Sequence, residues 1–307
     1  MADRLKLVFM GTPQFAVPSL EKLIHEGFDI AAVITAPDKP AGRGLLFTES
    51  PVKKCAIQHG IKILQPTNLK ALSFIDELQL LPADLFVVVA FRMLPEIVWN
   101  MPELGTINLH ASLLPDYRGA APINHAIING ETQTGLTTFF LKKEIDTGDI
   151  LFTTPIEILP DENAGSLHDK MMIAGAELLS QTVKAIESKN FNTIPQHQNS
   201  NKIAPKIFKE DCKINWNNSS QTIYNFIRGL SPYPTAWTIL EGKTLKIFSG
   251  KIIYGMPSQS PGNYITDGKQ YLHFVTADGV IDITELQLEG KKKMSVTDFL
   301  KGYRFNK

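Results

Sequence analysis

Two side chains with catalytic chemistry stand two positions apart in the chain. Asn108 and His110 lie in residues 106–110, a short run that predicts a strand, so both side chains leave the same face of a sheet. The residues that follow, including Pro115 and Gly119, are turn formers and end the strand. Open α/β sheets place their ligands at the carboxyl ends of strands, so this pair occupies a position typical of an active site.

A second segment, Glu144–Asp149, contributes Asp146 and is predicted to be a loop by its Thr-Gly pair. The amide of Asn108 can donate to a carbonyl oxygen that turns negative, and the imidazole of His110 can move protons near neutral pH. A carboxylate beside the ring would hold it and favour its charged form. Together these groups suit acyl transfer. The alternative is structural: a backbone-bonded amide, a core histidine and a turn-forming aspartate.

The motif around these residues resembles a known signature. Ser-Leu-Leu-Pro-x-Tyr-Arg-Gly-x-x-Pro, followed by Asp-Thr-Gly-Asp, is similar to the pattern of enzymes that use 10-formyltetrahydrofolate, and among them the chain most resembles the methionyl-tRNA formyltransferases. The similarity extends to residues 11–13 and 37–44. The resemblance implies formyl transfer from 10-formyltetrahydrofolate to methionyl initiator tRNA. It also implies that no metal is needed and that three residues are catalytic: Asn108, His110 and Asp146.

The same resemblance implies a folate pocket, in which apolar side chains pack on a flat ring system and backbone groups bond its edges. Its lining residues would be Ser112, Leu113, Leu114 and Pro115. An ordinary tight turn is the alternative. Arg118 would position the cofactor or the loop, or form a salt bridge that fixes the loop. Arg92 stands where family members often have glycine, which bears on the shape of the pterin pocket.

Residues 37–50 form a long connection, since about 2–6 residues are usual between a strand and a helix. By resemblance this loop enters the acceptor end of tRNA, where Arg43 would meet phosphate or bases and residues 45–47 would form an apolar wedge. We expect Lys39 to contribute charge there. Farther along, three lysines would bind phosphate without reading sequence: Lys291, Lys292 and Lys293. The alternatives are a flexible surface loop and a solvated charge run.

The composition is that of a soluble globular protein of 307 residues, 43% hydrophobic and 20% charged, long enough for two domains. The formal charge is zero, but residues 208–307 hold 13 Lys and Arg against 9 Asp and Glu, a local charge of +4. Such a modestly basic domain is compatible with a nucleic-acid partner. Two cysteines without paired spacing indicate neither a disulfide framework nor a zinc site. We expect a monomer in the cytoplasm, without a membrane segment.

Strands and helices alternate along the first part of the chain, which predicts an α/β fold with a doubly wound, mainly parallel, Rossmann-like sheet. The turn at residues 11–15 lacks the three-glycine pattern of dinucleotide sites, so a dinucleotide cofactor is not expected. The expected strands are 5–10, 30–35, 61–64, 85–90, 106–110, 135–141 and 150–158, and the expected helices are 15–26, 51–59, 69–78, 122–129 and 165–188.

We assign residues 1–189 to a formyl-folate-binding catalytic domain, 190–207 to a linker and 208–307 to a carboxyl-terminal tRNA-binding domain. The last domain contains many short strands with glycine turns, which suggests a small β-barrel. The resemblance implies an OB-like barrel, although periodicity alone does not separate a barrel from a sandwich. Its expected strands are 237–240, 244–253, 262–266, 271–276 and 280–288, and its expected helices are 220–230 and 295–303, the second capped by Ser295.

Two rival functions remain open at this stage. Another formyl-folate enzyme, acting on a sugar amine or a purine precursor, would share the three catalytic residues. It would need neither the loop at residues 37–50 nor the basic carboxyl-terminal domain. A non-catalytic RNA-binding protein, with the first domain as a scaffold, would bind tRNA without producing any formylated product.

Overall fold

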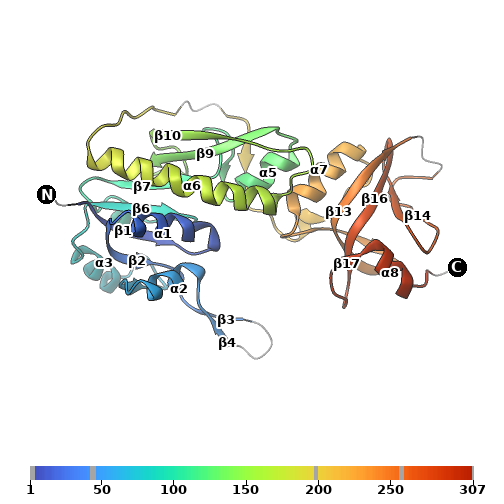
Figure 1. Cartoon of the computed structure of the whole chain (residues 1–307), viewed down its shortest axis with the longest axis horizontal. Helices are drawn as coiled ribbons and strands as arrows, with labels where there is room; N and C mark the ends of the chain where they lie inside the picture. Colours follow the sequence, from blue (N-terminus) through green and yellow to red (C-terminus); the bar gives the residue numbers. More distant parts are fainter. Residues whose placement is uncertain (1–3, 42–45, 197–199, 256–258, 306–307) are drawn as a thin grey trace. The chain divides into compact units, whose positions relative to one another are not determined.

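The computed structural model describes residues 4–41, 46–196, 200–255 and 259–305 (Figure 1). The chain divides into two compact units. The first unit comprises Met1–Arg118, Gly135–Ile156 and His168–Lys202. The second comprises Gly119–Thr134, Glu157–Leu167 and Ile203–Lys307, so it includes two segments that precede the carboxyl-terminal part of the chain.

The first unit is built on a seven-stranded sheet in the order β10-β9-β7-β6-β1-β2-β5. Neighbours from β7 to β5 pair in parallel, and β9 joins β7 antiparallel, which confirms the predicted mainly parallel sheet. The strands are β1 (Lys6–Gly11), β2 (Asp29–Ile34), β5 (Ile63–Leu64), β6 (Leu85–Val89), β7 (Thr106–His110), β9 (Gln133–Phe140) and β10 (Ile150–Glu157).

The expected helices all form, with ends that differ from the sequence estimates by a few residues. They are α1 (Val17–His25), α2 (Pro51–Gln58), α3 (Leu72–Gln79), α5 (Pro122–Ile128) and α6 (Ala164–Glu187). The helix α2 begins at Pro51 because the Ser50 side chain caps it, accepting a hydrogen bond from the Lys53 amide at 3.0 Å, and because proline suits the first helical position. Short elements that the sequence did not predict are η1 (Gln14–Ala16), α4 (Glu96–Trp99), and the paired β8 (Arg118–Gly119) and β11 (Ile203–Ala204).

The centre of this sheet is covered on both faces. All five residues of β6 are buried, as expected for a continuous apolar strand in the middle of a parallel sheet. On one face, Phe74, Ile75 and Leu78 of α3 pack in a cluster with residues of β1 and β6. This packing makes the strands a rigid support for the residues at their carboxyl ends.

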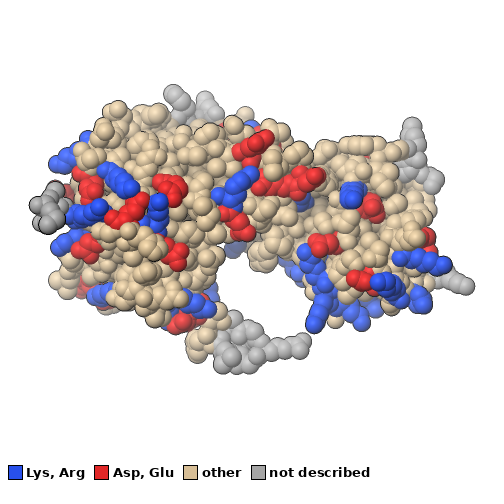
Figure 2. Space-filling view, viewed as in Figure 1, with Lys and Arg blue, Asp and Glu red and all other residues tan. Residues whose placement is uncertain are grey.

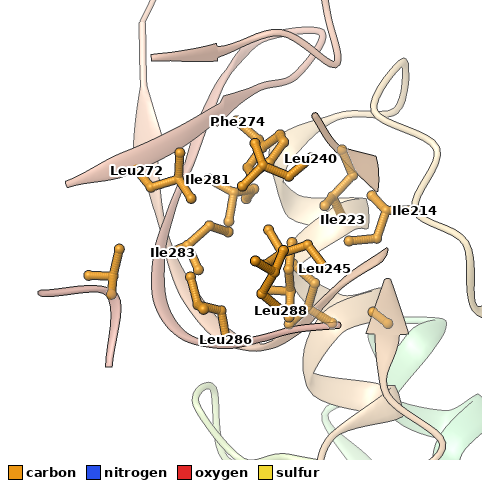
Figure 3. Close-up of a cluster of buried hydrophobic side chains, with 14 of the residues drawn as sticks. Ile214, Ile223, Leu240, Leu245, Leu272, Phe274, Ile281, Ile283, Leu286 and Leu288 are labelled. Atoms are coloured by element: carbon orange, nitrogen blue, oxygen red, sulfur yellow. The ribbon is translucent and has the colours of Figure 1, made fainter. Parts of the chain in front are cut away.

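The second unit contains a six-stranded, curled antiparallel sheet in the order β12-β13-β16-β15-β14, with β17 paired to β16. Its core gathers inward-pointing side chains from these strands, including Leu245, Ile283 and Leu286, as Figure 3 shows. The register between β13 and β16 shifts near Ser249, and such irregularities bend a sheet. This half-barrel is consistent with the expected OB-like fold.

The elements of the second unit from residue 205 onward include every predicted strand and helix, together with a 3-10 helix at Glu210–Cys212 and a short strand at Met294–Ser295 that the sequence did not predict. They are η2 (Glu210–Cys212), α7 (Ser220–Leu230), β12 (Ala236–Leu240), β13 (Lys243–Tyr254), β14 (Tyr264–Thr266), β15 (Leu272–Val275), β16 (Gly279–Leu288), β17 (Met294–Ser295) and α8 (Val296–Gly302). The Ser295 side chain accepts from the Asp298 amide at 3.2 Å, which confirms the predicted cap of α8.

Both cysteines, Cys55 and Cys212, are buried free thiols, and burial raises the pKa of Cys55 to about 11. Among the residues described, no helix is both long and apolar enough to cross a bilayer. The same residues contain no group of three or more His, Cys, Asp and Glu side chains placed to hold a metal ion.

Candidate active site

The predicted amide and imidazole lie at the carboxyl end of β7, between β6 and β9. Asn108 pairs with Val88 on one side and with Phe139 on the other, and its side chain is half-buried. In the part of the chain that the structure describes, the Asn108 amide makes no hydrogen bond. His110, two residues on and therefore on the same face of the strand, is only 6% exposed. The strand thus presents, beside a buried ring, an amide that has no hydrogen-bond partner among the described residues.

Both nitrogens of the His110 ring face protein oxygens. Nε2 donates to the backbone carbonyl of Tyr117 at 2.9 Å, and since a carbonyl can only accept, Nε2 carries a hydrogen. Nδ1 lies 3.7 Å from Oδ2 of Asp146, a distance that gives an ion pair when the ring is protonated. Nδ1 is therefore the atom at which the ring can gain and lose a proton, and it faces a carboxylate.

The loop that carries Asp146 is held against the end of β9. The Phe140 amide donates to the Asp149 carbonyl at 3.1 Å, and a Cβ added to Gly148 would lie 1.5 Å from the Phe140 carbonyl oxygen. Only glycine fits there. Asp146 itself has a φ of 54°, in the left-handed region that few non-glycine residues adopt. The sequence left open whether Asp146 reaches His110, and the structure brings the two side chains together.

The four residues predicted to line a folate pocket lie in the loop after β7. The side chains of Ser112 and Leu114 point into the protein: Ser112 is fully buried, and Leu114 packs with Phe139 and Ile150. Leu113 and Pro115 are half-buried. The expectation that Leu114 packs on a folate ring stays a prediction, and its side chain serves in this structure to fix the loop.

Buried Thr137 of β9 shapes the same loop. Its hydroxyl donates to the Ser112 carbonyl at 2.7 Å and accepts from the Leu114 amide at 3.1 Å. The Ser112 hydroxyl in turn donates to the Asp116 carbonyl at 2.5 Å. The sequence analysis missed Thr137 because nothing in a strand pattern marks a threonine that binds a distant loop.

Arg92, at the position where glycine is frequent, joins two loops at the carboxyl edge of the sheet. Its guanidinium donates to the carbonyl of Thr67 at 3.0 Å and to that of Pro66, and it lies over the Phe91 ring at 5.5 Å. The side chain thus ties the segment after β6 to the segment after β5. A glycine at this position would make none of these side-chain contacts between the two loops.

The long connection at residues 37–50 contains a hairpin that the sequence did not predict. Strand β3 (Lys39–Ala41) pairs antiparallel with β4 (Leu46–Thr48). Lys39 is exposed and Phe47 is 72% exposed, whereas Arg43 lies outside the described residues. The contact of this loop with tRNA stays a prediction, and its described residues include an exposed lysine and an exposed aromatic ring.

The base of this hairpin is fixed by a carboxylate. Asp38 accepts from the Lys53 ammonium at 2.5 Å and from Gln65 at 2.9 Å, and the hydrogen bond from Lys53 holds the pKa of Asp38 below its usual value. Lys53 also lies 3.2 Å from Glu49. The hairpin therefore projects from a structured base at the start of α2.

The three predicted phosphate-binding lysines lie between β16 and β17 of the second unit. Lys291 and Lys292 are exposed, and Lys293 pairs with Glu285 at 2.8 Å and lies over the Phe248 ring. Figure 2 shows Lys and Arg side chains gathered around β17 and α8. Lys293 is thus partly neutralised, which leaves Lys291 and Lys292 as the more available charges.

Comparison with known proteins identifies both units. Residues 5–183 match the formyl transferase family, and residues 206–304 match the formyl transferase carboxyl-terminal domain. The methionyl-tRNA formyltransferase of Flavobacterium johnsoniae is 50% identical over 309 residues, covering 99% of this chain and 98% of that protein. The protein of the same name from Phocaeicola vulgatus is 52% identical over 311 residues, covering 98% and 96%.

Solved structures share the fold at low identity. A sugar 3N-formyl transferase, WlaRD, crystallised with dTDP and 5-N-formyl-THF, gives a TM-score of 0.67 at 20% identity, covering 95% of this chain and all of that one. HypX from Aquifex aeolicus in complex with tetrahydrofolic acid gives a TM-score of 0.67 at 17% identity, covering 99% of this chain and 49% of that one. With both domain matches and relatives at half identity over nearly its whole length, the chain belongs to the methionyl-tRNA formyltransferases of the formyl transferase family.

Proposed function

We propose that the chain transfers a formyl group from 10-formyltetrahydrofolate to the α-amino group of methionyl initiator tRNA, for use in translation initiation. The observation that carries this proposal is the similarity to methionyl-tRNA formyltransferases, which are 50% and 52% identical to this chain over nearly its whole length and through both domains. We further propose that it acts as a monomer in the cytoplasm, with residues 1–189 catalytic, 190–207 a linker and 208–307 binding tRNA.

The reaction makes two demands on the protein. The acceptor amine attacks the formyl carbon, a C–N bond forms, and the former carbonyl oxygen becomes negative. The bond from that carbon to N10 of the folate then breaks, and the proton lost by the amine ends on N10. A formyl transferase therefore needs a donor for the oxygen and a group that moves the proton.

The residues at the end of β7 fit both demands. The Asn108 amide, which has no partner among the described residues, is available to donate to the developing oxyanion. His110 has a hydrogen fixed on Nε2 by the Tyr117 carbonyl, so its Nδ1 takes the proton from the amine and returns it to the leaving nitrogen. Asp146, 3.7 Å from Nδ1, stabilises the ring while it is charged.

The folate would be held by the loop after β7. Leu113 and Pro115 would supply apolar side-chain surface, while Ser112 and Leu114, whose side chains are buried, would contribute through the loop backbone, which Thr137 holds in place. When bound, 10-formyltetrahydrofolate supplies the activated formyl group. Two solved structures of the same fold were obtained with folate derivatives, which is compatible with this position.

The tRNA would contact both units. In the first, Lys39 and Arg43 of the 37–50 loop meet the acceptor end, beside the exposed Phe47 ring. In the second, Lys291, Lys292 and Lys293 meet backbone phosphate, Lys291 and Lys292 contributing most because Lys293 is paired with Glu285. Replacing Lys291 and Lys292 by Ala should raise KM for tRNA and flatten its salt dependence, while kcat and KM for the folate change little.

The deciding experiment incubates the purified protein with 10-formyltetrahydrofolate and methionyl-tRNA, initiator or elongator, and follows formyl-methionine. The proposal expects rapid formylation of the initiator substrate. Formylation of a free amino sugar but not of charged tRNA would replace it with a small-amine enzyme. Tight tRNA binding without any formyl product would replace it with an RNA-binding protein.

A further inference from the structure

Gln196, in the segment 190–207 that the sequence predicts as a linker, contacts the loop that carries Asp146. The Nε2 atom of Gln196 donates to the carbonyl of Asp146 at 3.0 Å and to the carbonyl of Gly148 at 2.7 Å. Its Oε1 atom accepts from Nε of Arg118 at 3.2 Å and from Nη2 at 2.6 Å. The amide is thus bound at both ends, and the donors on Arg118 fix which end is oxygen.

A second attachment holds the same segment in place. Ile194, two residues before Gln196, exchanges two backbone hydrogen bonds with Ile150, at 2.8 and 2.9 Å. Ile150 follows directly after the Glu144–Asp149 loop. Residues 194–196 therefore run beside this loop, fixed by backbone bonds at one point and by an amide side chain at the other.

Gln196 also joins the two loops that set the surroundings of His110. Arg118 follows Tyr117, whose carbonyl holds Nε2 of His110, and Asp146 faces Nδ1 of the same ring. The side chains of Arg118 and Gln196, together with the backbone carbonyl of Asp146, therefore link the two loops on either side of the imidazole. A shift of Gln196 would change the distance between Nδ1 and the carboxylate without touching either group directly.

The backbone at Asp146 needs such support. A φ of 54° at a non-glycine residue is a sparsely populated conformation that persists only where surrounding structure enforces it. The amide of Gln196 binds the carbonyl of this strained residue and a carbonyl two residues on. Loss of both bonds would allow the loop to relax toward a conformation in which the carboxylate leaves the ring.

We propose that Gln196 is a positioning residue for formyl transfer, which holds the Asp146 carboxylate against His110 and is itself oriented by Arg118. This inference rests on the proposed function and deepens it, because it assigns part of the predicted linker, residues 190–207, to the support of the catalytic residues. Sequence composition gave no sign of it, since the segment is polar and has the composition of a linker.

The test is a double-mutant cycle. Gln196→Met keeps the length of the side chain and removes both donors, and it should lower kcat by about 10- to 100-fold, the cost of misplacing a catalytic group, with each KM changed less than about twofold. In an Asp146→Ala background the same substitution should change kcat less than about twofold, because its target is gone. Gln79→Met, at an exposed glutamine that ends α3, is the matched control and should leave kcat unchanged.

A readout that needs no turnover accompanies the cycle. Hydrogen exchange of the peptide spanning residues 141–150 should become faster in Gln196→Met and stay unchanged in Gln79→Met. If Gln196→Met does not fold, Gln196→Glu takes its place: it keeps an acceptor for Arg118 and loses the donors to the two carbonyls. The same fall in kcat in both backgrounds, or unchanged kcat and exchange, would overturn the inference. Wild-type protein without formylation would overturn the proposed function alone, since hydrogen exchange still reports on Gln196.

Discussion

Each unit contains a group of polar and ionisable side chains that includes an asparagine and an aspartate. The two groups differ in whether their hydrogen-bonding atoms are bound to other protein atoms. At the end of β7, the Asn108 amide has no partner among the described residues, and Nδ1 of His110 faces a carboxylate beyond hydrogen-bond distance, at 3.7 Å. The second group, which we call the α7 cluster, borders a cavity of about 520 Å³ in the second unit. It consists of Asp161, Gln221, Tyr224, Asn225 and Arg228.

In the α7 cluster the side chains bind one another. The Tyr224 hydroxyl donates to Asp161 at 2.9 Å, while Nε of Arg228 and Nε2 of Gln221 both donate to Oδ1 of Asn225, at 3.0 and 3.1 Å. Burial, and then the bond to Asp161, raises the pKa of Tyr224, so the phenol stays a donor. A cavity lined by groups already engaged with each other indicates a structural role, whereas donors without protein partners indicate a site for a substrate.

The largest effect that tests this comparison is expected from removing the His110 imidazole at the end of β7. His110→Ala should lower kcat for formylation by about 10²- to 10⁴-fold, the usual effect of losing an acid–base group, with the fold intact. Single-turnover formylation measures the rate, and thermal unfolding followed by circular dichroism checks the fold. A rate near that of the wild type would mean that the proton moves without His110.

Removing the amide tests the donor directly. Asn108→Ala should lower kcat by about 10²- to 10³-fold, which corresponds to about 2.7–4 kcal/mol of barrier and is typical of a lost oxyanion donor. Since Asn108 has no protein partner in the described residues, its loss should cost little stability, and that combination distinguishes it from a structural amide. If the variant lost stability but kept its formylation rate, Asn108 would have a structural role like that of the α7 cluster.

The contrast also shows what sequence patterns can and cannot predict. The β6 strand follows from a continuous apolar run at Leu85–Val89, and the α6 helix follows from the helical spacing of apolar residues within Ala164–Glu187. The β3 and β4 strands are three residues each, too short for any period to be detected. Local patterns therefore predict the longer strands and helices, but they do not predict the β3–β4 hairpin in the loop at residues 37–50.

The sequence predicted which residues form the candidate site, but it did not predict which of their side chains contact one another. Asn108 and His110 share a strand, so their common face follows from alternation alone. Asp146, which faces the ring, and Gln196, which binds the Asp146 carbonyl, come from segments 36 and 86 residues away from His110, and no local rule predicts such contacts. Gly148 offered the one available signal, because an Asp-Thr-Gly-Asp loop suggests a close backbone approach, which the structure shows at the Phe140 carbonyl.

Substitutions in the α7 cluster are expected to have the opposite effect: they should lower the free energy of unfolding and leave kcat unchanged. Arg228 is 8% exposed, and it donates to Asn225 and to the Glu162 carbonyl, each at 3.0 Å. Arg228→Met removes both hydrogen bonds of a buried guanidinium, which should lower the free energy of unfolding by about 1–3 kcal/mol. Urea unfolding followed by the fluorescence of Trp216 and Trp237, both in the second unit, measures the loss. kcat should change less than about twofold, and a large fall in kcat would give the cluster a role in the reaction.

The smallest expected effect concerns the start of α7 and depends on pH. Asp278 accepts from the Ser220 amide at 2.7 Å, and this bond, with that from the Ser220 hydroxyl, lowers the pKa of Asp278 below its usual value of 3.8. A carboxyl whose pKa is lower in the folded state stabilises the fold fully above the unfolded pKa and loses that contribution as pH falls through the folded pKa.

Asp278→Asn keeps an acceptor for Ser220 and removes the charge, so the variant should unfold at lower urea than the wild type at pH 6, and the gap should close as pH falls below about 4. Glu103→Gln, at an exposed position in the first unit, removes one negative charge elsewhere and controls for net charge. The formylation rate at neutral pH should stay at the wild-type value in both variants. A gap that persists at low pH would mean that Asp278 acts through its shape and not through its charge. A change in rate would contradict the division of roles between the two polar groups, since Asp278 supports the helix that carries the α7 cluster.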